Sequence, residues 1–265
     1  MDNSIDLKNK NVLVTGASRG IGAGIAKVMA ACGANVLINY MRHKESAEEL
    51  AVLLQKEYLV KVASFCADIS KKEDVEKMFL YSDKNFGSID ILINNAGCES
   101  IEHALFLDLD EWDRIFNVNV KGAFHCSQQA GRRMAEKKSG VIINISSIHD
   151  KVPRKGLVHY CSSKAALNMM TKCLALELAE YNIRVLTVSP GAIETEMNRD
   201  EINKFGREKF NNWIPMGKIG NVDDVAWTCA FIASDKAAYM TATEFYIDGG
   251  YKESTIPYDP RKKNK

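Results

Sequence analysis

The segment that decides the fold reads Asn11-Val12-Leu13-Val14-Thr15-Gly16-Ala17-Ser18-Arg19-Gly20-Ile21-Gly22. Its first part is a short apolar run typical of a buried strand, and the residues after Gly22 are apolar at helical spacing up to a stop at Gly33. The glycines therefore lie where a strand meets a helix, a place where backbone N–H groups and the helix N-terminus can hold a pyrophosphate. Glycines also serve as ordinary punctuation between elements, and the spacing Gly-x-x-x-Gly-x-Gly differs from the general dinucleotide fingerprint. In this position the turn nevertheless predicts dinucleotide binding.

The rest of the chain repeats the alternation of apolar strands and amphipathic helices. We expect strands at 11–15, 35–39, 61–66, 89–93, 141–145, 183–188 and 244–247, and helices after Gly20 and at 44–59, 71–86, 109–138, 160–181 and 222–234. Strands that are apolar throughout indicate a parallel sheet covered by helices on both faces. We therefore predict a single doubly wound α/β domain over residues 1–251, with a C-terminal tail at 252–265 whose basic end is flexible.

Composition excludes several classes of protein. The chain has 265 residues with 46% hydrophobic and 26% charged residues, and its net charge of +1 gives no indication of nucleic acid or an anionic membrane as a partner. No apolar run reaches the roughly 18 residues needed to span a bilayer. Seven cysteines without a Cys-x-x-Cys pair, together with a polar N-terminus that has no signal-peptide core, predict a cytoplasmic protein without a metal site.

Tyr160 and Lys164 open the long helical pattern at 160–181. Residues four apart lie on the same face of a helix, so the phenol and the ammonium should be neighbours. A free tyrosine titrates near pH 10, and a nearby cation lowers that pKa, with each unit corresponding to about 1.4 kcal/mol. A proton donor or acceptor closer to the working pH is what an alcohol–carbonyl interconversion needs. Alone, Tyr-x-x-x-Lys is also compatible with a surface tyrosine packed on a lysine stem.

The end of the second strand bears on the choice of cofactor. An acidic residue there would bind an adenosine 2′-hydroxyl and repel a 2′-phosphate. The sequence instead reads Asn39-Tyr40-Met41-Arg42-His43-Lys44, and Arg19 lies in the glycine turn nearby. Arg42 and Lys44 would otherwise be the solvated start of a helix, but three cations at one corner favour a phosphate. We expect NADP(H) to be preferred, with NAD(H) also accepted.

Three motifs together resemble those of the short-chain dehydrogenase/reductase family, namely Thr15 to Gly22, Asn94-Asn95-Ala96-Gly97, and Ser147 with Tyr160 and Lys164. The resemblance extends to about Tyr251. It implies a seven-stranded Rossmann-type sheet and a catalytic tetrad of Asn119, Ser147, Tyr160 and Lys164, in which Asn119 anchors a water of a proton relay. Asp68 would contact adenine, Asn94, Ala96 and Gly97 would line the cofactor, and Pro190 to Thr195 would hold the nicotinamide amide. With the turn and the strand end, this gives the following cofactor-binding residues: Gly16, Ser18, Arg19, Gly20, Ile21, Gly22, Asn39, Tyr40, Arg42, Asp68, Ile69, Asn95, Ala96, Gly97, Tyr160, Lys164, Pro190, Gly191, Ile193 and Thr195.

Ser147 has a role that can be argued from its position. It follows the expected strand 141–145, at the carboxyl edge of the sheet where such folds bind ligands, and can hold a substrate oxygen while Tyr160 transfers the proton. The alternative for Ser147 is a hydroxyl that caps the next turn. Asn119 is a mildly poor helix former, and its alternative is a solvated helix residue.

Substrate choice is less well defined. The segments around Gly97-Cys98-Glu99, Ser146 to Tyr160, Gly191 to Thr195 and Ile214 to Gly220 are similar to the bacterial glucose 1-dehydrogenase branch of the family. In that case Ser147, Glu99 and His149 would face the substrate, and the last two suit hydroxyl recognition. Glu99 and His149 are otherwise a solvent-facing carboxylate and a loop histidine. The expected loop from Glu196 to Trp213 is more apolar than a sugar requires (Met197, Phe205, Phe210, Trp213), and Ala242 replaces a glycine common in the family.

Three functional hypotheses therefore stay open. The first is a sugar dehydrogenase of the glucose 1-dehydrogenase type. The second is a reductase of 3-oxoacyl thioesters, where Arg132 and Arg133 would serve an acidic carrier protein, or a hydroxysteroid dehydrogenase. The third is a non-catalytic dinucleotide sensor, against which the intact tetrad argues. The long helices at 109–138 and 160–181 resemble those that pair in related proteins, and we expect a homotetramer.

Overall fold

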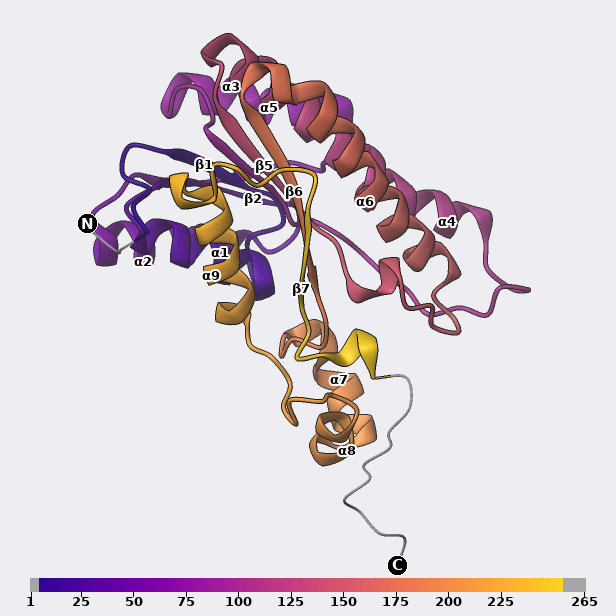
Figure 1. Ribbon diagram of the computed structural model, residues 1–265. Coiled ribbons are helices and arrows are strands. Elements are labelled where there is room, and N and C mark those ends of the chain that lie inside the picture. Colours follow the sequence, from indigo (N-terminus) through magenta and orange to yellow (C-terminus); the bar gives the residue numbers. More distant parts are fainter. Residues whose placement is uncertain (1–4, 255–265) are drawn as a thin grey trace, which may run out of the picture.

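A parallel sheet runs through the centre of the protein in the computed structural model, which describes residues 5–254 (Figure 1). Its strand order is β3-β2-β1-β4-β5-β6-β7. The direction in which the chain adds strands to the sheet therefore reverses between β1 and β4, and folds of this kind bind ligands at the carboxyl ends of the strands beside such a reversal. The strands are β1 (Asn11–Val14), β2 (Asn35–Tyr40), β3 (Val62–Cys66), β4 (Ile91–Asn94), β5 (Gly140–Ile145), β6 (Ile183–Pro190) and β7 (Glu244–Ile247).

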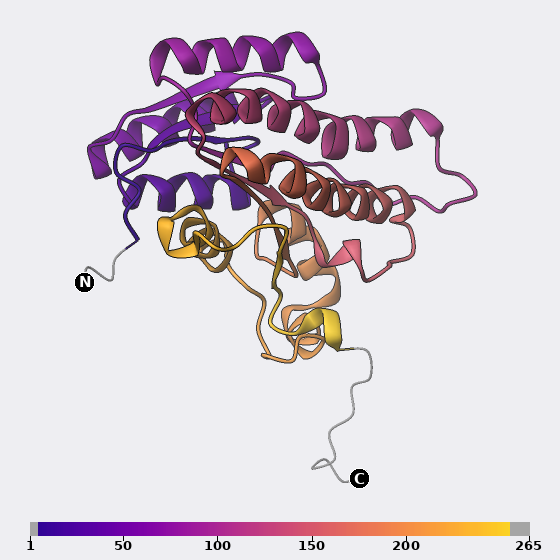
Figure 2. The ribbon, with the colours of Figure 1, turned by 45° about the horizontal axis from the view of Figure 1, so that its top comes forward.

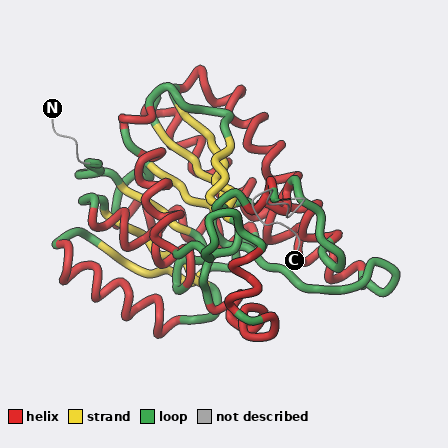
Figure 3. Tube along the Cα trace, turned by 60° about the horizontal axis from the view of Figure 1, so that its bottom comes forward, coloured by secondary structure: helices red, strands yellow, loops and turns green. Residues whose placement is uncertain are grey.

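Helices cover both faces of this sheet (Figures 2 and 3). One face is packed by α1 (Gly20–Ala31), α2 (Lys44–Tyr58) and α9 (Val222–Ala233), and the other by α3 (Lys72–Asn85), α5 (Ala123–Lys137) and α6 (Val158–Leu178). The two cores follow from strand alternation: Val12 and Val14 point to the first layer, while Leu13 points to the second. All three are fully buried. The predicted α/β fold with a seven-stranded parallel sheet is confirmed.

The helix expected at 109–138 is interrupted. It consists of α4 (Leu109–Phe116), a π-helical turn η1 (Asn117–Gly122) and α5. A π-turn inserts an extra residue into a helix and is frequent at functional sites. Asp108 caps the start of α4 by accepting a hydrogen bond from the N–H of Asp110 at 2.9 Å.

The segment expected to be a loop at 196–213 contains two helices, so that expectation was wrong. They are α7 (Glu196–Phe205) and α8 (Arg207–Asn212), separated by Gly206 at φ 85°. Glycine reaches that conformation without steric cost, so one helix can end and the next begin there. Phe210 and Ile214 are buried, and the rings of Phe210 and Trp213 pack at 5.1 Å. Phe210 and Trp213 therefore pack on each other, and Ile214 lies against Gly249.

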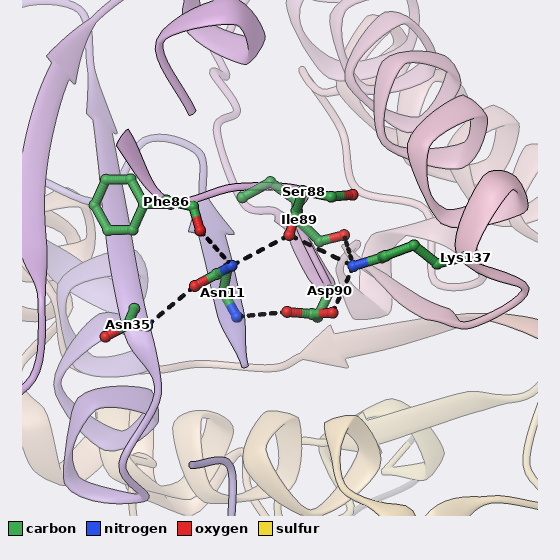
Figure 4. Close-up of polar contacts among 7 residues, drawn as sticks. All are labelled: Asn11, Asn35, Phe86, Ser88, Ile89, Asp90 and Lys137. Carbon is green, nitrogen blue, oxygen red and sulfur yellow. Dashed lines mark hydrogen bonds and ion pairs between the residues drawn. The ribbon is translucent and has the colours of Figure 1, made fainter. Parts of the chain in front are cut away.

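The amino ends of the strands are joined by a polar cluster at the edge opposite the carboxyl ends of β1 and β4 (Figure 4). The N–H of Asn11 donates to Asp90 at 2.8 Å, and its side chain donates to the carbonyl of Phe86 at 2.7 Å and accepts from Asn35 at 3.0 Å. Lys137 at the end of α5 pairs with Asp90 at 2.6 Å. This cluster ties β1, β2, β4 and α5 together and lies far from the strand ends that form the site.

Short 3₁₀ turns complete the chain: η2 (Ile148–Asp150), η3 (Ala179–Tyr181), η4 (Asp235–Ala237) and η5 (Tyr251–Glu253). Of the predicted tail, residues 252–254 are described, Lys252 and Glu253 within η5, and residues 255–265 lie outside the described part. All seven cysteines are free thiols. Among residues 5–254, no helix has the length and apolarity to cross a membrane and no cluster of side chains has the makings of a metal site.

Candidate active site

The glycine turn between β1 and α1 packs closely on the segment after β4, at the carboxyl edge of the sheet. Gly16 has φ +62°, and a Cβ there would lie 2.7 Å from Cα of Ala96. A Cβ on Gly22 would lie 2.5 Å from the amide nitrogen of Asn95. Within the described residues no side chain caps the N-terminus of α1, and its first turn carries no acidic residue. These features fit the pyrophosphate of a nicotinamide dinucleotide.

The two asparagines after β4 have different structural roles. Asn95 donates to the carbonyls of Thr15 and Gly16, both at 3.0 Å, and so holds the glycine turn in place. Asn94, which we expect from the sequence to line the cofactor, is buried and instead points its side chain under the helices, where its amide donates to Ser127 and Asn144 at 2.8 Å. Ala96 lies directly over Gly16. The Asn-Asn-Ala-Gly motif thus fixes the turn through Asn95 and fixes α5 through Asn94.

The end of β2 separates buried residues from exposed cations. Asn39 is buried, accepts from the N–H of Gly16 at 3.1 Å and donates to the carbonyl of Ala67 at 3.0 Å, so its side chain joins the turn to the strand ends. Tyr40 is also buried. Arg42 is exposed, and Arg19 is half-exposed and paired with Glu196 at 2.7 Å. Both arginines are thus accessible to an anion. An anion that binds Arg19 would have to displace the carboxylate of Glu196.

The remaining predicted cofactor residues lie along the same edge. Asp68, just after β3, accepts from the N–H and the hydroxyl of Ser70 at 3.0 and 2.7 Å, and Ile69 is buried against Gly122. Pro190 ends β6, and Gly191 packs closely on Asp248. Ile193 is buried, and Thr195 lies directly before α7, with its side chain near Gly20 and without a capping hydrogen bond to the described residues. The start of α7 therefore lies next to the glycine turn.

Tyr160 and Lys164 are neighbours on the first turns of α6, as their spacing predicts. Lys164 is 5% exposed, and its ammonium lies 5.7 Å from the ring centre of Tyr160 and donates to the carbonyl of Ile145 at 2.9 Å. Ser147 follows β5 and its hydroxyl is hydrogen-bonded to Tyr160. The same hydroxyl accepts from the N–H of His149 at 3.2 Å, so Ser147 also caps the turn η2. The structure thus brings Ser147, Tyr160 and Lys164 together.

The protonation of this group differs from our expectation. Burial raises the pKa of Tyr160 above its ordinary value, the charge of Glu99 raises it further, and the hydrogen bond with Ser147 acts the other way. Burial also lowers the pKa of Lys164, to about 8. The expectation that Lys164 lowers the pKa of Tyr160 is therefore wrong, because burial of the phenol and the charge of Glu99 outweigh the neighbouring cation.

Asn119 lies inside the π-turn and is 1% exposed, so it is not a solvated helix residue. Its side chain accepts from the N–H of Cys98 at 2.9 Å and donates to the Cys98 carbonyl and the Ser163 hydroxyl at 3.0 Å. A Cβ on Gly97 would lie 3.4 Å from Asn119 Oδ1 and 3.5 Å from Lys164 Nζ. Asn119 and Lys164 therefore meet at Gly97, which places Asn119 next to the group formed by Ser147, Tyr160 and Lys164.

The predicted substrate residues also lie beside Tyr160. The ring of His149 is 6.4 Å from that of Tyr160 in an edge arrangement, and its Nδ1 is 2.8 Å from the carbonyl of Val152. Glu99 is close enough for its charge to act on the Tyr160 hydroxyl. The surroundings of the phenol are therefore polar on the sides formed by Ser147, His149 and Glu99.

Sequence reasoning missed a contact behind the tyrosine. His159 is fully buried, and its Nε2 is 2.9 Å from the hydroxyl of Ser100. Its Nδ1 finds no hydrogen-bond partner among the described residues. Glu111 on α4 is bonded to Arg114 and to Ser100, which lowers its pKa to about 2. The only signal in the sequence was the position of His159 directly before Tyr160.

Comparisons with known proteins agree with this geometry. The family model described as "Enoyl-(Acyl carrier protein) reductase" matches residues 16–252. The chain is 40% identical over 247 residues to the 3beta-hydroxysteroid dehydrogenase 1 of Eggerthella lenta, covering 92% of this chain and 94% of that protein. It is 36% identical over 247 residues to the glucose 1-dehydrogenase 2 of Bacillus subtilis, covering 92% and 95%.

Two further proteins give a similar result. The chain is 38% identical over 243 residues to the 3-oxoacyl-acyl-carrier-protein reductase of Staphylococcus aureus, covering 91% of this chain and 97% of that protein. A solved structure of a short-chain type dehydrogenase/reductase from Mycobacterium marinum superposes with a TM-score of 0.87 at 34% identity, covering 93% and 97%. The relatives share a fold and differ in the substrates that their names print.

Proposed function

This chain belongs to the short-chain dehydrogenase/reductase family and is an oxidoreductase that acts on CH–OH groups, and we propose that it oxidises a hydroxyl-rich substrate of the sugar type with NADP. The observation that carries the proposal is the polar surroundings of the Tyr160 hydroxyl, formed by Ser147, His149 and Glu99. A sugar presents several hydroxyls, and a site that recognises it needs matching polar partners. Glucose is the substrate we propose to try first.

The residues of the site divide the chemistry as follows. Ser147 donates a hydrogen bond to the substrate oxygen, and Tyr160 takes the hydroxyl proton as general base or returns it in the reverse direction. Lys164 holds a positive charge beside the phenol and favours its ionised form. Asn119 fixes the backbone of Cys98 next to Lys164. When bound, the nicotinamide dinucleotide accepts or donates the hydride.

We propose NADP(H) as the preferred cofactor, with NAD(H) also used. Arg42 is exposed just after the end of β2, and Arg19, in the glycine turn, pairs with Glu196 at the start of α7. Guanidinium groups bind phosphate oxygens through paired, charge-assisted hydrogen bonds. A 2′-phosphate at this corner would compete with Glu196 for Arg19.

The other hypotheses are a hydroxysteroid dehydrogenase, a carrier-protein reductase and a dinucleotide sensor. The hydroxysteroid alternative rests on the 40% identity to the Eggerthella lenta protein. In the segment 196–213, however, Phe210 is buried and packs on Trp213, so the Phe210 ring is not free to cover a flat ligand; the side chains of Met197 and Phe205 lie outside the described part. For a carrier-protein reductase, Arg133 is committed to Asp83 at 2.7 Å, which leaves Arg132 as the exposed arginine at that helix end. The intact tetrad argues against a dinucleotide sensor.

We also propose a cytoplasmic homotetramer of single-domain subunits that acts on a small molecule, with neither nucleic acid nor membrane as a partner. Large apolar side chains are exposed around the start of α4 and along α6, including Phe106, Leu109 and Leu176 at 76–77%. Exposed apolar residues gathered in this way are typical of an interface. A single monomeric species in light scattering at micromolar protein would contradict the tetramer.

A substrate screen with both cofactors tests the proposal. The protein is mixed with NADP or NAD and glucose, or with NADP or NAD and a 3β-hydroxysteroid, and NADPH is mixed with an acetoacetyl thioester; absorbance at the reduced-nicotinamide band is followed. We expect glucose-dependent reduction that is faster with NADP than with NAD. Turnover of the steroid alone or of the thioester alone would support the corresponding alternative. If no substrate were turned over, the dinucleotide sensor would be the remaining hypothesis.

A further inference from the structure

Two carboxyl groups meet between α6 and the edge of the sheet. Asp150 ends the turn η2, Glu244 begins β7, and their side chains are hydrogen-bonded to each other. Asn168 on α6 donates to both, to Asp150 at 2.7 Å and to Glu244. Asp150 is 8% exposed and Asn168 is 2% exposed. The three side chains form a nearly buried cluster that the catalytic chemistry described above does not use.

Strand alternation explains why further polar groups reach this cluster. In the parallel pairing of β6 and β7, Thr187 lies opposite Glu244 and Ser189 lies opposite Tyr246, so all four point to the face covered by α6. Ser189 donates to Glu244 at 2.6 Å, Tyr246 donates to Asp150 at 3.3 Å, and Thr187 donates to Asn168 at 3.3 Å. The hydroxyl groups of Thr187, Ser189 and Tyr246 thus all donate hydrogen bonds to the cluster.

The cluster connects the two halves of the catalytic group. Asn168 lies one turn beyond Lys164 and two turns beyond Tyr160, on the same face of α6. Asp150 lies in the short turn that Ser147 caps, and its own N–H donates to the Ser147 carbonyl at 3.1 Å. The Asp150–Asn168 bond therefore joins the segment that carries Ser147 to the helix that carries Tyr160.

We propose that Asp150 and Glu244 share one proton and, through Asn168, hold the Ser147 segment in register with Tyr160 and Lys164, as positioning residues for the oxidoreduction. Two carboxylates in contact in a poorly solvated place cannot both be ionised without strong repulsion. Burial and the contact with Glu244 raise the pKa of Asp150 to about 7. Burial acts to raise the pKa of Glu244 as well, but its hydrogen bonds from Asp150, Ser189, Tyr246 and Asn168 outweigh burial, and its pKa is lowered.

Other charges around the cluster act in defined directions. Lys151, on the η2 side, favours the ionised form of Asp150. On α6, the charge of Asp150 raises the pKa of Lys164 against the effect of burial. On the side of β7, Lys252 lies over the ring of Tyr246 at 4.6 Å and senses Glu244 and Asp248, while it pairs with Glu253. A second negative charge on the pair would therefore be felt both by the Ser147 segment and by Lys164.

Infrared spectroscopy of the full chain tests the shared proton without any substrate. A protonated carboxyl group has a carbonyl stretch distinct from that of a carboxylate, and its frequency shifts in D₂O. Just below pH 7 we expect this band in the wild type, and in Glu244→Gln it should appear only at lower pH, because Asp150 then loses the contact with Glu244 that raises its pKa and keeps only the effect of burial. Glu136→Gln, at the exposed end of α5, is the matched control and should keep the band. A wild type without the band would overturn the proposal.

Kinetic measurements test whether the cluster positions Ser147. This experiment rests on the proposed function, because it needs turnover of glucose with NADP. With glucose and NADP, we expect Asp150→Ala to lower kcat by about 10- to 100-fold through misplacement of Ser147, and Asp150→Asn to restore most of it. The ratio of kcat between Glu244→Gln and the wild type should rise as pH rises through about 7, because only the wild type gains the second charge. A pH-independent ratio would overturn the proposal.

The two proposals fail in different ways. If glucose is not turned over by any of the proteins, the proposed function fails. Hydrogen exchange then shows whether Asp150 and Glu244, through Asn168, hold the Ser147 segment in place. In that experiment Asp150→Ala should expose the amides of 147–152 to exchange, while Asp150→Asn and Glu136→Gln should leave their protection as in the wild type. Equal protection in Asp150→Ala would show that the cluster does not hold the segment.

Discussion

Replacing Lys164 by methionine should stabilise the protein at neutral pH while removing its activity. Lys164 is nearly fully buried, and its pKa falls from 10.5 to about 8 because burial penalises the charged form. That difference corresponds to about 3 kcal/mol of folding free energy. Methionine is similar in length and has no charge to bury, but it leaves the carbonyl of Ile145 without its 2.9 Å donor, which costs about 1 kcal/mol. The expected gain at pH 7 is about 2 kcal/mol.

The sign of the pH dependence follows from proton binding. Between pH 8 and 10.5 the unfolded chain holds the lysine proton and the folded protein does not, so the wild type becomes more stable relative to the variant as pH rises through this window. Below pH 8 the penalty on the wild type is present in full, and above pH 10.5 it is gone. The raised pKa of Tyr160 acts on both proteins above pH 10 and cancels to first order in the difference.

Urea unfolding at one protein concentration, from pH 7 to pH 10, measures this difference. The free energy of unfolding of Lys164→Met should exceed that of the wild type at pH 7, and the gap should close as pH approaches 10. Lys27→Met, on the exposed side of α1, is the control and should change stability by less than about 0.5 kcal/mol at every pH. A variant less stable than the wild type at pH 7, or a constant gap, would refute the reasoning.

Four further changes test other parts of the structure. Ala242→Gly should raise the free energy of unfolding by about 0.5–1 kcal/mol in urea, because Ala242 sits at φ 57°, whereas Ala238→Gly, at φ −56°, should lower it; a loss in the first variant would contradict this. Asn119→Ala should cost about 2–3 kcal/mol in the same assay, since the Cys98 N–H and carbonyl lose their partners, and unchanged stability would argue against the observed bonds. Asn11→Ala should cost about 1–3 kcal/mol but leave kcat/KM unaltered, because its contacts lie at the opposite edge of the sheet; a fall in kcat/KM would show that this edge affects the site. Arg42→Ala should raise the Kd of NADP in fluorescence titration by about tenfold and that of NAD hardly at all, and equal changes would remove Arg42 from phosphate recognition.

The fold was predictable because its signals are local. Val12, Leu13 and Val14 are apolar on both faces of a strand, and the glycines after them mark the junction with a helix, so the alternation could be read along the chain. Tyr160 and Lys164 could be paired for the same reason, since helix geometry alone places residues four apart on one face. Family motifs then added Ser147 and Asn119, and the structure brings all four residues to one edge of the sheet.

What sequence reasoning missed depends on contacts between distant parts of the chain. The π-turn that buries Asn119 follows no periodicity, and its cause lies in packing against Cys98 and Ser163. The pairing of Asp150 with Glu244 requires knowing that β7 lies beside β6 and beneath α6. The pKa of Tyr160 was misjudged because adjacency to a lysine can be read from the sequence, whereas burial cannot.

The central claim is that the Tyr160 hydroxyl moves the proton. The most direct test is to measure both turnover and cofactor affinity for Tyr160→Phe. Removing only the hydroxyl should lower kcat by about 10²- to 10⁴-fold and leave the Kd of NADPH close to that of the wild type, while Tyr181→Phe, on the partly exposed turn η3, should change neither. A Tyr160→Phe protein that turns over substrate at the wild-type rate would contradict the account.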